Sequence, residues 1–159
     1  MFGLAFFRRT IDIHSKKIGV AGRLSNFTKR AFDFEGIKCR SIEGVLQSLK
    51  FENPDEQKIV CGLYGVQAKY AGELKTEWKK TQTLYWNGIA FKRDSDIYKK
   101  LVDRLYMSVY KQDEQFRQDV KKAAKYKLVH SIGNPNPEDT VLTEAEFIGC
   151  LEKLYLLDE

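Results

Sequence analysis

The most informative segment of this chain reads Ser41-Ile42-Glu43-Gly44-Val45-Leu46-Gln47-Ser48-Leu49-Lys50-Phe51. Ser41 is a favourable N-cap, so the segment is predicted to be a helix that ends near Phe51. Seven residues turn a helix by about 700°, which places Glu43, Gln47 and Lys50 on one polar stripe. The neighbouring stripe is apolar, and its residues are Ile42, Leu46 and Leu49. The helix is expected to bury this stripe and to carry a carboxylate and an amine at its edge. Spacing alone favours a simpler alternative, in which Glu43 contacts Gln47 on a solvated surface and Lys50 is free.

Turn and cap signals predict further elements on both sides of this helix. Upstream, Glu35-Gly36 lies between two short apolar runs and predicts a tight hairpin of residues 31–34 and 37–39. Downstream, Asn53-Pro54 combines an N-cap with a proline at the first helical position, which predicts a helix from Pro54 to about Cys61. A third short helix is expected over 66–74.

The second half of the chain carries the same kinds of signal. Asn87-Gly88 predicts another hairpin, of residues 83–86 and 89–91. A long amphipathic helix is expected from Ser95, and a second helix after it. Their apolar positions are Ile97, Leu101, Leu105 and Val109 in the first helix, and Phe116, Val120 and Ala124 in the second. Thr143-Glu144-Ala145-Glu146 is a capping box that opens a last helix. Its inward residues are expected to be Phe147, Leu151 and Leu154.

Two further segments are predicted to be strands, Phe6–Ile13 and Tyr126–His130. The chain shows neither an internal repeat nor a composition break of linker length, so residues 1–159 are expected to form a single domain. The expected fold class is α+β, a helix-rich domain with a small antiparallel sheet.

Composition restricts the class of protein. Of the 159 residues, 43% are hydrophobic and 31% are charged, which is typical of a globular protein. No apolar run approaches the roughly 20 residues that a membrane span requires. The three cysteines, Cys39, Cys61 and Cys150, are odd in number and far apart in sequence, so they imply no disulfide framework. A soluble cytoplasmic protein without a membrane partner is expected.

The net charge of +5 is unevenly distributed. Residues 138–159 sum to −6, so the preceding residues carry +11. Such a basic body favours a polyanionic partner, for example a nucleic acid or a dinucleotide. The alternative is that the lysines only solvate helix surfaces.

The common signatures of catalytic sites are missing from the sequence. It has no Walker loop, and Gly19-Val20-Ala21-Gly22 lacks the third glycine of a dinucleotide fingerprint. His14 and His130 are too far apart to suggest a zinc site with scattered cysteines. No Gly-x-Ser-x-Gly nucleophile elbow occurs. Neither a metal nor a cofactor is therefore expected.

A series of short motifs carries a family resemblance. Leu24-Ser25-Asn26-Phe27 is followed by the Phe34-Glu35-Gly36 hairpin, then by Ser41-Ile42-Glu43 and Gln47-Ser48-Leu49-Lys50-Phe51. Further along are Tyr85-Trp86-Asn87-Gly88, His130-Ser131-Ile132-Gly133 and the segment 140–147. In this order, from about Arg23 to Leu154, the chain resembles the NADAR family, also called YbiA-like.

The resemblance implies N-glycosidase chemistry. One branch of the family cleaves the C–N bond of phosphoribosylated riboflavin precursors, and another removes ADP-ribose from guanine in DNA, which reverses a DarT-type toxin. Many riboflavin-type members carry an Asp-x-x-Trp-Gly motif near the end, where this chain has His130-Ser131-Ile132-Gly133. The chain is therefore more similar to the ADP-ribosyl-guanine, phage-type branch.

The resemblance also implies two catalytic residues. Glu43 is expected to stabilise the positive charge that develops at the anomeric carbon, or to activate water. Lys50 is expected to attack the opened ribose as an amine and to form a Schiff base. Burial would lower the pKa of Lys50, whereas an ionised Glu43 would raise it, so the choice between the two routes stays open.

Seven residues are expected to bind the substrate: Arg23, Ser25, Asn26, Phe27, Gln47, Trp86 and His130. Arg23 would clamp a phosphate and Asn26 would bind ribose or pyrophosphate. Trp86 would stack on a base, or else be a core aromatic. His130 would assist a proton transfer, or else be a satisfied buried histidine.

The expected partner is an ADP-ribosylated nucleotide or DNA whose modified base is flipped out; the sequence does not indicate an oligomeric state. Three alternatives remain. The first is the riboflavin-type reaction, and the second is a non-catalytic module that binds ADP-ribose or NAD. The third is a plain nucleic-acid binder, which the basic body would suit.

Overall fold

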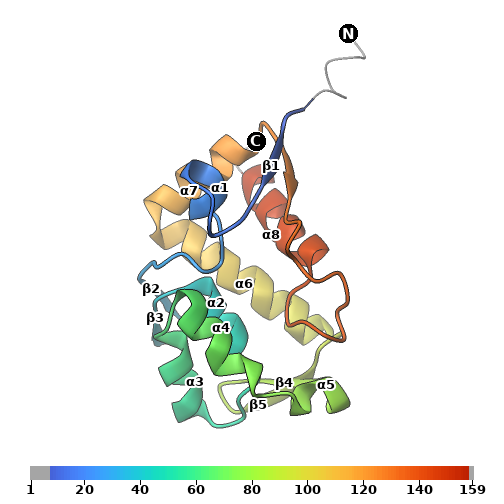
Figure 1. Cartoon of the computed structure of the whole chain (residues 1–159). Coiled ribbons are helices and arrows are strands. Elements are labelled where there is room, and N and C mark those ends of the chain that lie inside the picture. The colour runs from blue at the N-terminus through green and yellow to red at the C-terminus, as the bar shows by residue number, and fades with distance from the viewer. Residues whose placement is uncertain (1–7, 158–159) are drawn as a thin grey trace.

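The computed structural model describes residues 8–157. Helices make up most of this range (Figure 1). They are α1 (Gly19–Arg23), α2 (Ile42–Ser48), α3 (Pro54–Cys61), α4 (Gly65–Glu73), α5 (Glu77–Thr81), α6 (Asp96–Gln112), α7 (Glu114–Ala123) and α8 (Glu144–Leu156). The strands are β1 (Thr10–Asp12), β2 (Phe32–Phe34), β3 (Ile37–Cys39), β4 (Thr83–Trp86), β5 (Ile89–Lys92) and β6 (Lys127–Val129). The short helices α1 and α5 are not predicted from the sequence.

Both antiparallel hairpins are present where the sequence predicts them. β2 pairs with β3, and β4 pairs with β5. The turn residues Glu35-Gly36 and Asn87-Gly88 all have a positive φ, between 48° and 84°. This is the backbone of the tight turns whose twist matches that of a hairpin. The local dipeptides therefore determine where the chain reverses.

The remaining two strands form a parallel pair. Ile11 of β1 lies opposite Leu128 of β6. The sequence predicts strands near both positions but not their pairing, because parallel neighbours need a long connection that leaves no turn signal. β1 begins at Thr10, and Phe6 and Phe7 of the predicted strand lie outside the described residues. The α+β class, rich in helices with small antiparallel sheets, is confirmed.

The helix α2 contacts α3, α4 and β3 and is surrounded by them (Figure 1). Its N-cap is confirmed, since Ser41 Oγ accepts a hydrogen bond from Gly44 N (2.8 Å) and donates one to Leu63 O (2.8 Å). A Cβ at Gly44 would lie 2.8 Å from the carbonyl oxygens of Val60 and Leu63, so only glycine allows this close approach of α3. The α-helix ends at Ser48, earlier than predicted.

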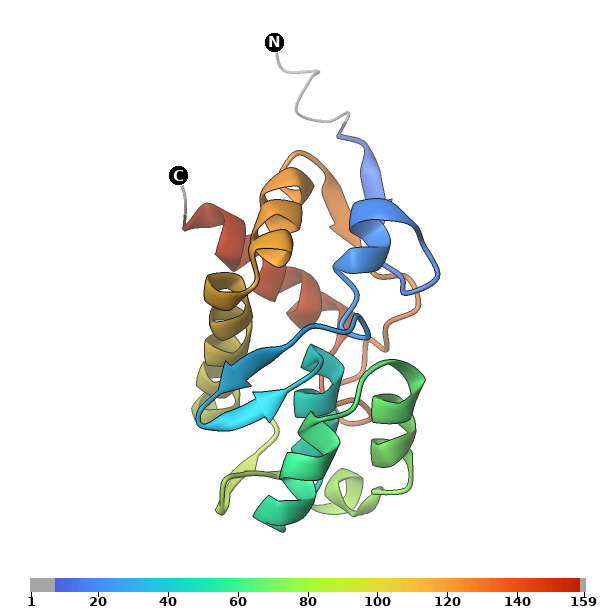
Figure 2. The same cartoon turned by 90° about the vertical axis from the view of Figure 1, so that its left-hand side faces the viewer.

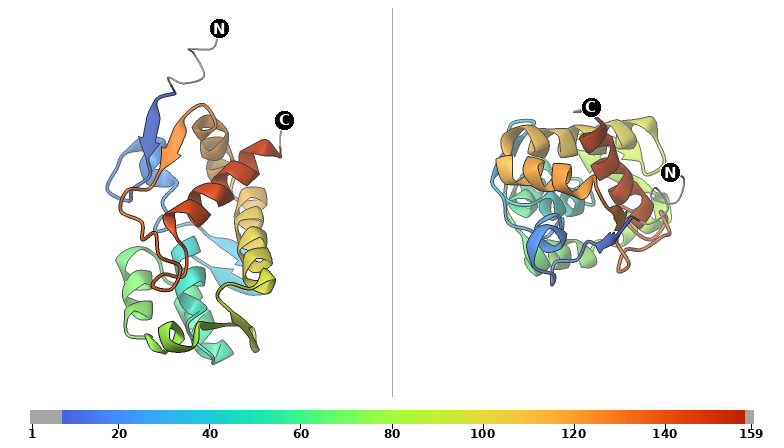
Figure 3. Two further views of the ribbon diagram at one scale, coloured as in Figure 1. Left: turned by 90° about the vertical axis from the view of Figure 1, so that its right-hand side faces the viewer. Right: turned by 90° about the horizontal axis from the view of Figure 1, so that it is seen from above.

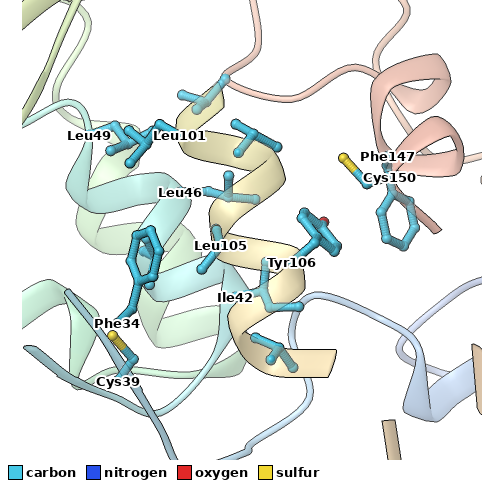
Figure 4. Packing of buried hydrophobic residues seen from close by; sticks show 14 of the residues in the cluster. Phe34, Cys39, Ile42, Leu46, Leu49, Leu101, Leu105, Tyr106, Phe147 and Cys150 are labelled. Carbon is cyan, nitrogen blue, oxygen red and sulfur yellow. The ribbon is translucent and has the colours of Figure 1, made fainter. Parts of the chain in front are cut away.

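The apolar face of α2 packs against α6 (Figure 4). Ile42, Leu46 and Leu49 are at most 3% exposed, and Leu105 and Tyr106 of α6 are each 1% exposed. Ile97 is the exception among the positions predicted to be apolar and inward on α6, because it is 53% exposed. The helix buries instead Tyr98, Leu101, Val102, Leu105, Tyr106, Val109 and Tyr110.

A long loop connects β6 to α8 and runs down toward α2 and α4, as Figures 2 and 3 show. Its end is fixed by the predicted capping box. Glu146 N donates to Thr143 Oγ1 (3.1 Å), and Thr143 N donates to Glu146 Oε1 (2.8 Å). Arg93 adds two hydrogen bonds to the Glu146 carboxylate, of 3.0 and 2.5 Å. The loop is therefore held rigidly where it reaches α2.

None of the helices that the structure describes is both long enough and apolar enough to cross a membrane.

Candidate functional site

A cavity of about 260 Å³ lies where α2, α4, the loop after α1 and the loop before α8 meet. Both charged and apolar side chains form its wall. It is lined by Ser15, Ser25, Asn26, Phe27, Glu43, Leu46, Gln47, Lys69, His130, Ile132, Gly133, Asn134, Thr140, Val141, Leu142 and Phe147. Six residues predicted from the sequence to form the site therefore lie around one cavity: Ser25, Asn26, Phe27, Glu43, Gln47 and His130.

Glu43 is the acidic residue of this wall. It is half-buried in the first turn of α2, where its backbone N donates to Asn26 O (3.0 Å) and its Oε1 accepts from Gln47 Nε2 (2.8 Å). Burial raises the pKa of Glu43 above its ordinary value, although the Gln47 hydrogen bond and the charges of Lys50, Lys69 and His130 oppose this rise. The hydrogen bond and the neighbouring positive charges thus offset only part of the free-energy cost of burying an ionised carboxylate.

Gln47 is held in place by α4. A Cβ at Gly72 would overlap Gln47 Oε1, so the absence of a side chain there lets the amide pack against the α4 backbone. Gln47 Oε1 is buried and has no hydrogen-bond partner among the described residues. The amide is consequently oriented with its NH₂ group toward Glu43, and its oxygen is buried without a hydrogen bond, which costs free energy.

Lys50 is close to this pair but is not part of the cavity wall. The last residues of the segment form i→i−3 hydrogen bonds, including Lys50 N to Gln47 O (3.2 Å), and in such a turn side chains three residues apart eclipse each other. Lys50 therefore lies beyond Gln47, and its Nζ donates to Gly72 O (3.3 Å). Burial lowers the pKa of Lys50 to about 8, with a further contribution from Lys79, whereas Glu43 opposes the shift.

Lys69 is the lysine that lines the cavity, and sequence reasoning missed it. It is exposed on α4, next to Ala68, which with Gly72 forms the buried face of that helix. A pair of small residues four positions apart indicates a close helix contact, and this was the signal available in the sequence. Its charge lowers the pKa of Glu43, which shows that the two groups interact.

The loop after α1 contributes a polar wall. Tyr106 OH donates to Asn26 Oδ1 (2.7 Å), and Ser25 Oγ accepts from Phe27 N (3.2 Å). Burial raises the pKa of Tyr106 well above its ordinary value, so its hydroxyl stays neutral and keeps donating. Asn26 is left with its NH₂ group as the donor available to a ligand.

His130 faces the cavity from the opposite side. Its Nδ1 lies 2.7 Å from Ile13 O, which can only accept, so Nδ1 carries the proton and Nε2 is the nitrogen available to a substrate. The ring contacts the Phe147 ring edge-on, with centroids 5.0 Å apart. A Cβ at Gly133 would lie 2.7 Å from His130 Cδ2, so this loop also depends on a glycine.

Besides Lys50, two predicted site residues, Arg23 and Trp86, are not brought to the cavity. Arg23 forms a two-pronged ion pair with Asp119 (2.8 and 2.9 Å), which joins α1 to α7. Trp86 is 6% exposed, packs on Phe34 with ring centroids 5.3 Å apart, and donates from Nε1 to Glu35 Oε2 (3.2 Å). Trp86 is therefore a core aromatic, and the predicted stacking face and phosphate clamp are absent from the cavity.

The described residues contain no group of three His, Cys, Asp or Glu side chains placed to hold a metal ion. Charged, hydroxyl, amide and imidazole groups are therefore what the cavity offers to a ligand.

The fold matches that of a solved structure. The NMR structure of the E. coli protein YbiA superimposes with a TM-score of 0.64, covering 94% of this chain and 84% of that one. The sequences are only 14% identical, so this likeness concerns the fold. The NADAR-type architecture expected from the motifs is thereby supported.

The sequence itself matches phage proteins. An uncharacterized 17.1 kDa protein from the Gp30-rIII intergenic region of Enterobacteria phage T4 is 38% identical over 133 residues, which cover 82% of this chain and 87% of the phage protein. The family model described as bacteriophage protein GP30.3 matches residues 19–155. The chain therefore belongs to the bacteriophage GP30.3 family.

Proposed function

We propose that this protein is an N-glycosidase that hydrolyses a ribosyl C–N bond, and that its substrate is ADP-ribosylated guanine in DNA. The observation that carries the proposal is Glu43, a half-buried carboxyl group with a raised pKa in the wall of a cavity of about 260 Å³. The YbiA-like fold and the motif resemblance support the reaction class. The His130-Ser131-Ile132-Gly133 segment supports the guanine branch.

The chemistry follows from the charge that develops in the transition state. As the C–N bond breaks, the anomeric carbon becomes positive, and an ionised Glu43 stabilises it. Oε1 of Glu43 accepts the hydrogen bond from Gln47, which leaves Oε2 of Glu43 for the sugar or for water. Water adds to the anomeric carbon and its proton passes through Glu43 to the departing guanine nitrogen. The products are ADP-ribose and unmodified guanine.

A raised pKa suits both halves of this proton transfer. A carboxyl group whose pKa lies nearer to neutrality is a stronger base toward water and remains able to protonate the leaving nitrogen. Asn26 Nδ2 and His130 Nε2 are the neighbouring groups we assign to ribose hydroxyls. Lys69, the exposed cation at the wall, is assigned to the pyrophosphate.

Lys50 distinguishes direct hydrolysis from a Schiff-base route. With a pKa of about 8, about a tenth of the amine is neutral at pH 7, which favours a nucleophile. Its Nζ is bonded to Gly72 O, so attack on the opened ribose requires the side chain to turn past Gln47. Borohydride added during turnover traps a covalent adduct on Lys50 if the Schiff-base route operates, and no adduct if hydrolysis is direct.

The function is tested by incubating the purified protein with an oligonucleotide that carries one ADP-ribosylated guanine. We expect release of ADP-ribose and restoration of guanine by the wild type, but not by Glu43→Gln. A phosphoribosylated riboflavin precursor serves as the second substrate. Turnover of that compound alone would reassign the protein to the riboflavin branch, and binding of ADP-ribose without any product would make it a binding module.

A further inference from the structure

Two exposed cations near the cavity lie over the same aromatic ring, that of Tyr64. Lys29 Nζ lies 5.2 Å from the centroid of the Tyr64 ring, and the Arg40 guanidinium lies 5.6 Å from it. We call these three residues the Tyr64 patch. Within residues 8–157, neither Lys29 nor Arg40 forms an ion pair with a carboxylate.

Only some of the exposed cations in the described part of the chain are paired with a carboxylate. Arg104 pairs with Glu35 at 2.9 Å, and Lys153 pairs with Asp103 at 3.1 Å. Arg104 and Asp103 are residues of α6. In the Tyr64 patch, both cations lie over the face of the Tyr64 ring, which attracts positive charge. Since neither cation is paired with a carboxylate, both positive charges are available to an anion such as a phosphate.

The patch is continuous with the cavity. Tyr64 is the N-cap of α4, and the next residue, Gly65, donates its N–H to Phe27 O (3.0 Å). Phe27 lines the cavity, and so does Lys69, one turn further along α4. Lys29 follows Phe27 by two residues. A chain that leaves the cavity across Phe27 therefore meets the Tyr64 patch next.

We propose that the Tyr64 patch binds the phosphates of the single-stranded DNA that flanks the base held in the cavity. This inference rests on the proposed function. A base that enters a cavity walled by α2, α4 and two loops has to leave the stack of its neighbours, so the target nucleotide is unstacked. An already single-stranded substrate avoids the cost of opening a pair, and its flexible backbone can follow the protein surface.

The first test measures binding of an unmodified, fluorescent single-stranded oligonucleotide over a series of salt concentrations. The variant Lys29→Gln/Arg40→Gln removes two cations from the patch. The control Lys99→Gln/Lys100→Gln removes two exposed cations from α6. We expect the patch variant to bind at least about tenfold more weakly and its salt slope to fall by about 1.4, since each single-strand phosphate contact contributes about 0.7. The control should bind as the wild type does.

The second test separates this inference from the proposed function. With ADP-ribosyl-guanine as the substrate, the patch variant should raise KM on an oligonucleotide and leave both KM and kcat on the free nucleoside unchanged. If the wild type cleaves neither substrate, the proposed function fails, and the binding assay still tests the patch.

Three results would overturn the inference. Equal affinities of the patch and control variants would show that the cations do not contact the strand. If the patch variant raised KM equally on the oligonucleotide and on the free nucleoside, the patch would be assigned to the pyrophosphate of ADP-ribose. Equal binding of duplex and single strand would remove the preference for an unpaired substrate. Melting temperatures of both double variants verify that each remains folded.

Discussion

Two half-buried glutamates at the starts of two helices, Glu43 of α2 and Glu146 of α8, have opposite surroundings. Burial acts to raise the pKa of Glu146, but hydrogen bonds and charge from Arg93 together with hydrogen bonds from Thr143 outweigh it and lower the pKa. Glu43 has one amide donor and more distant cations, and its pKa is raised. A completely paired carboxylate stabilises the fold, whereas an incompletely paired one beside a cavity is free to act on a substrate.

The largest expected effect is the loss of catalysis in Glu43→Gln. Removing the charge that stabilises the transition state should lower kcat by about 10³-fold, measured as ADP-ribose release. Because burial disfavours the ionised carboxylate, the melting temperature should not fall. The matched variant Glu146→Gln should lower the melting temperature and retain kcat. Comparable kcat values in the two variants would contradict the assignment of catalysis to Glu43 and of a structural role to Glu146.

Next in size is the effect of Arg93→Met on stability. Arg93 is 3% exposed and its loss leaves Glu146 without its cation, so we expect the free energy of unfolding to fall by about 3 kcal/mol. Arg104→Met provides the control, because its ion pair with Glu35 is about half exposed and should contribute less than about 1 kcal/mol. Urea unfolding measures both. A similar loss in the two variants would contradict the role assigned to Arg93.

A smaller effect is expected from a single methyl group at Gly72. In Gly72→Ala the new Cβ overlaps Gln47 Oε1, which displaces the amide from Glu43 and should lower kcat by about tenfold. Gly149→Ala is the control, since a Cβ there meets nothing within 4 Å, and the change in α8 should stabilise the protein by about 0.5–1 kcal/mol. An unchanged kcat in Gly72→Ala would show that Gln47 does not orient Glu43.

The smallest expected effects are on the pH dependence of the free energy of unfolding. The two glutamates change it in opposite directions. Glu43 has a pKa raised above the ordinary 4.5, so its ionisation destabilises the fold as the pH rises through the interval above 4.5. The pKa of Glu146 is lowered, so its contribution is present above 4.5 and is lost as the pH falls below it. In unfolding titrations, Glu43→Gln should remove the first dependence and Glu146→Gln the second. The same pH profile in both variants would contradict the two pKa shifts.

Local signals account for what the sequence predicts correctly. The Ser41 cap, the capping box at Thr143 and the Asn87-Gly88 turn each depend on residues within a few positions of one another. The stripe of Glu43 and Gln47 is also local, and the structure places both residues at the cavity. These features are therefore set by short-range hydrogen bonds.

The features that the sequence left open or missed depend on contacts between distant segments. For Trp86 the sequence leaves a stacking face and a core aromatic open, and Phe34 and Glu35 from another hairpin enclose it in the core. Lys69 reaches the cavity only because α4 packs on α2. Lys50 stays in line with Gln47 in the tighter turn after Ser48, but it lies one turn further from Glu43, where its Nζ donates to Gly72 O of α4. Of these outcomes, only the position of Lys69 has a signal within a few residues, namely the small residues Ala68 and Gly72 on the buried face of α4.

The hydrogen bond from His130 to Ile13 O has a consequence for synthesis of the protein. It joins residues 117 positions apart, beside the parallel pairing of β1 with β6. Contacts of such separation form late, because a long loop has to close first. The residues of α2, with their glutamate, are therefore synthesised well before the imidazole that lines the same cavity. The cavity wall should therefore be complete only after residues 127–130 have been synthesised and β6 has paired with β1.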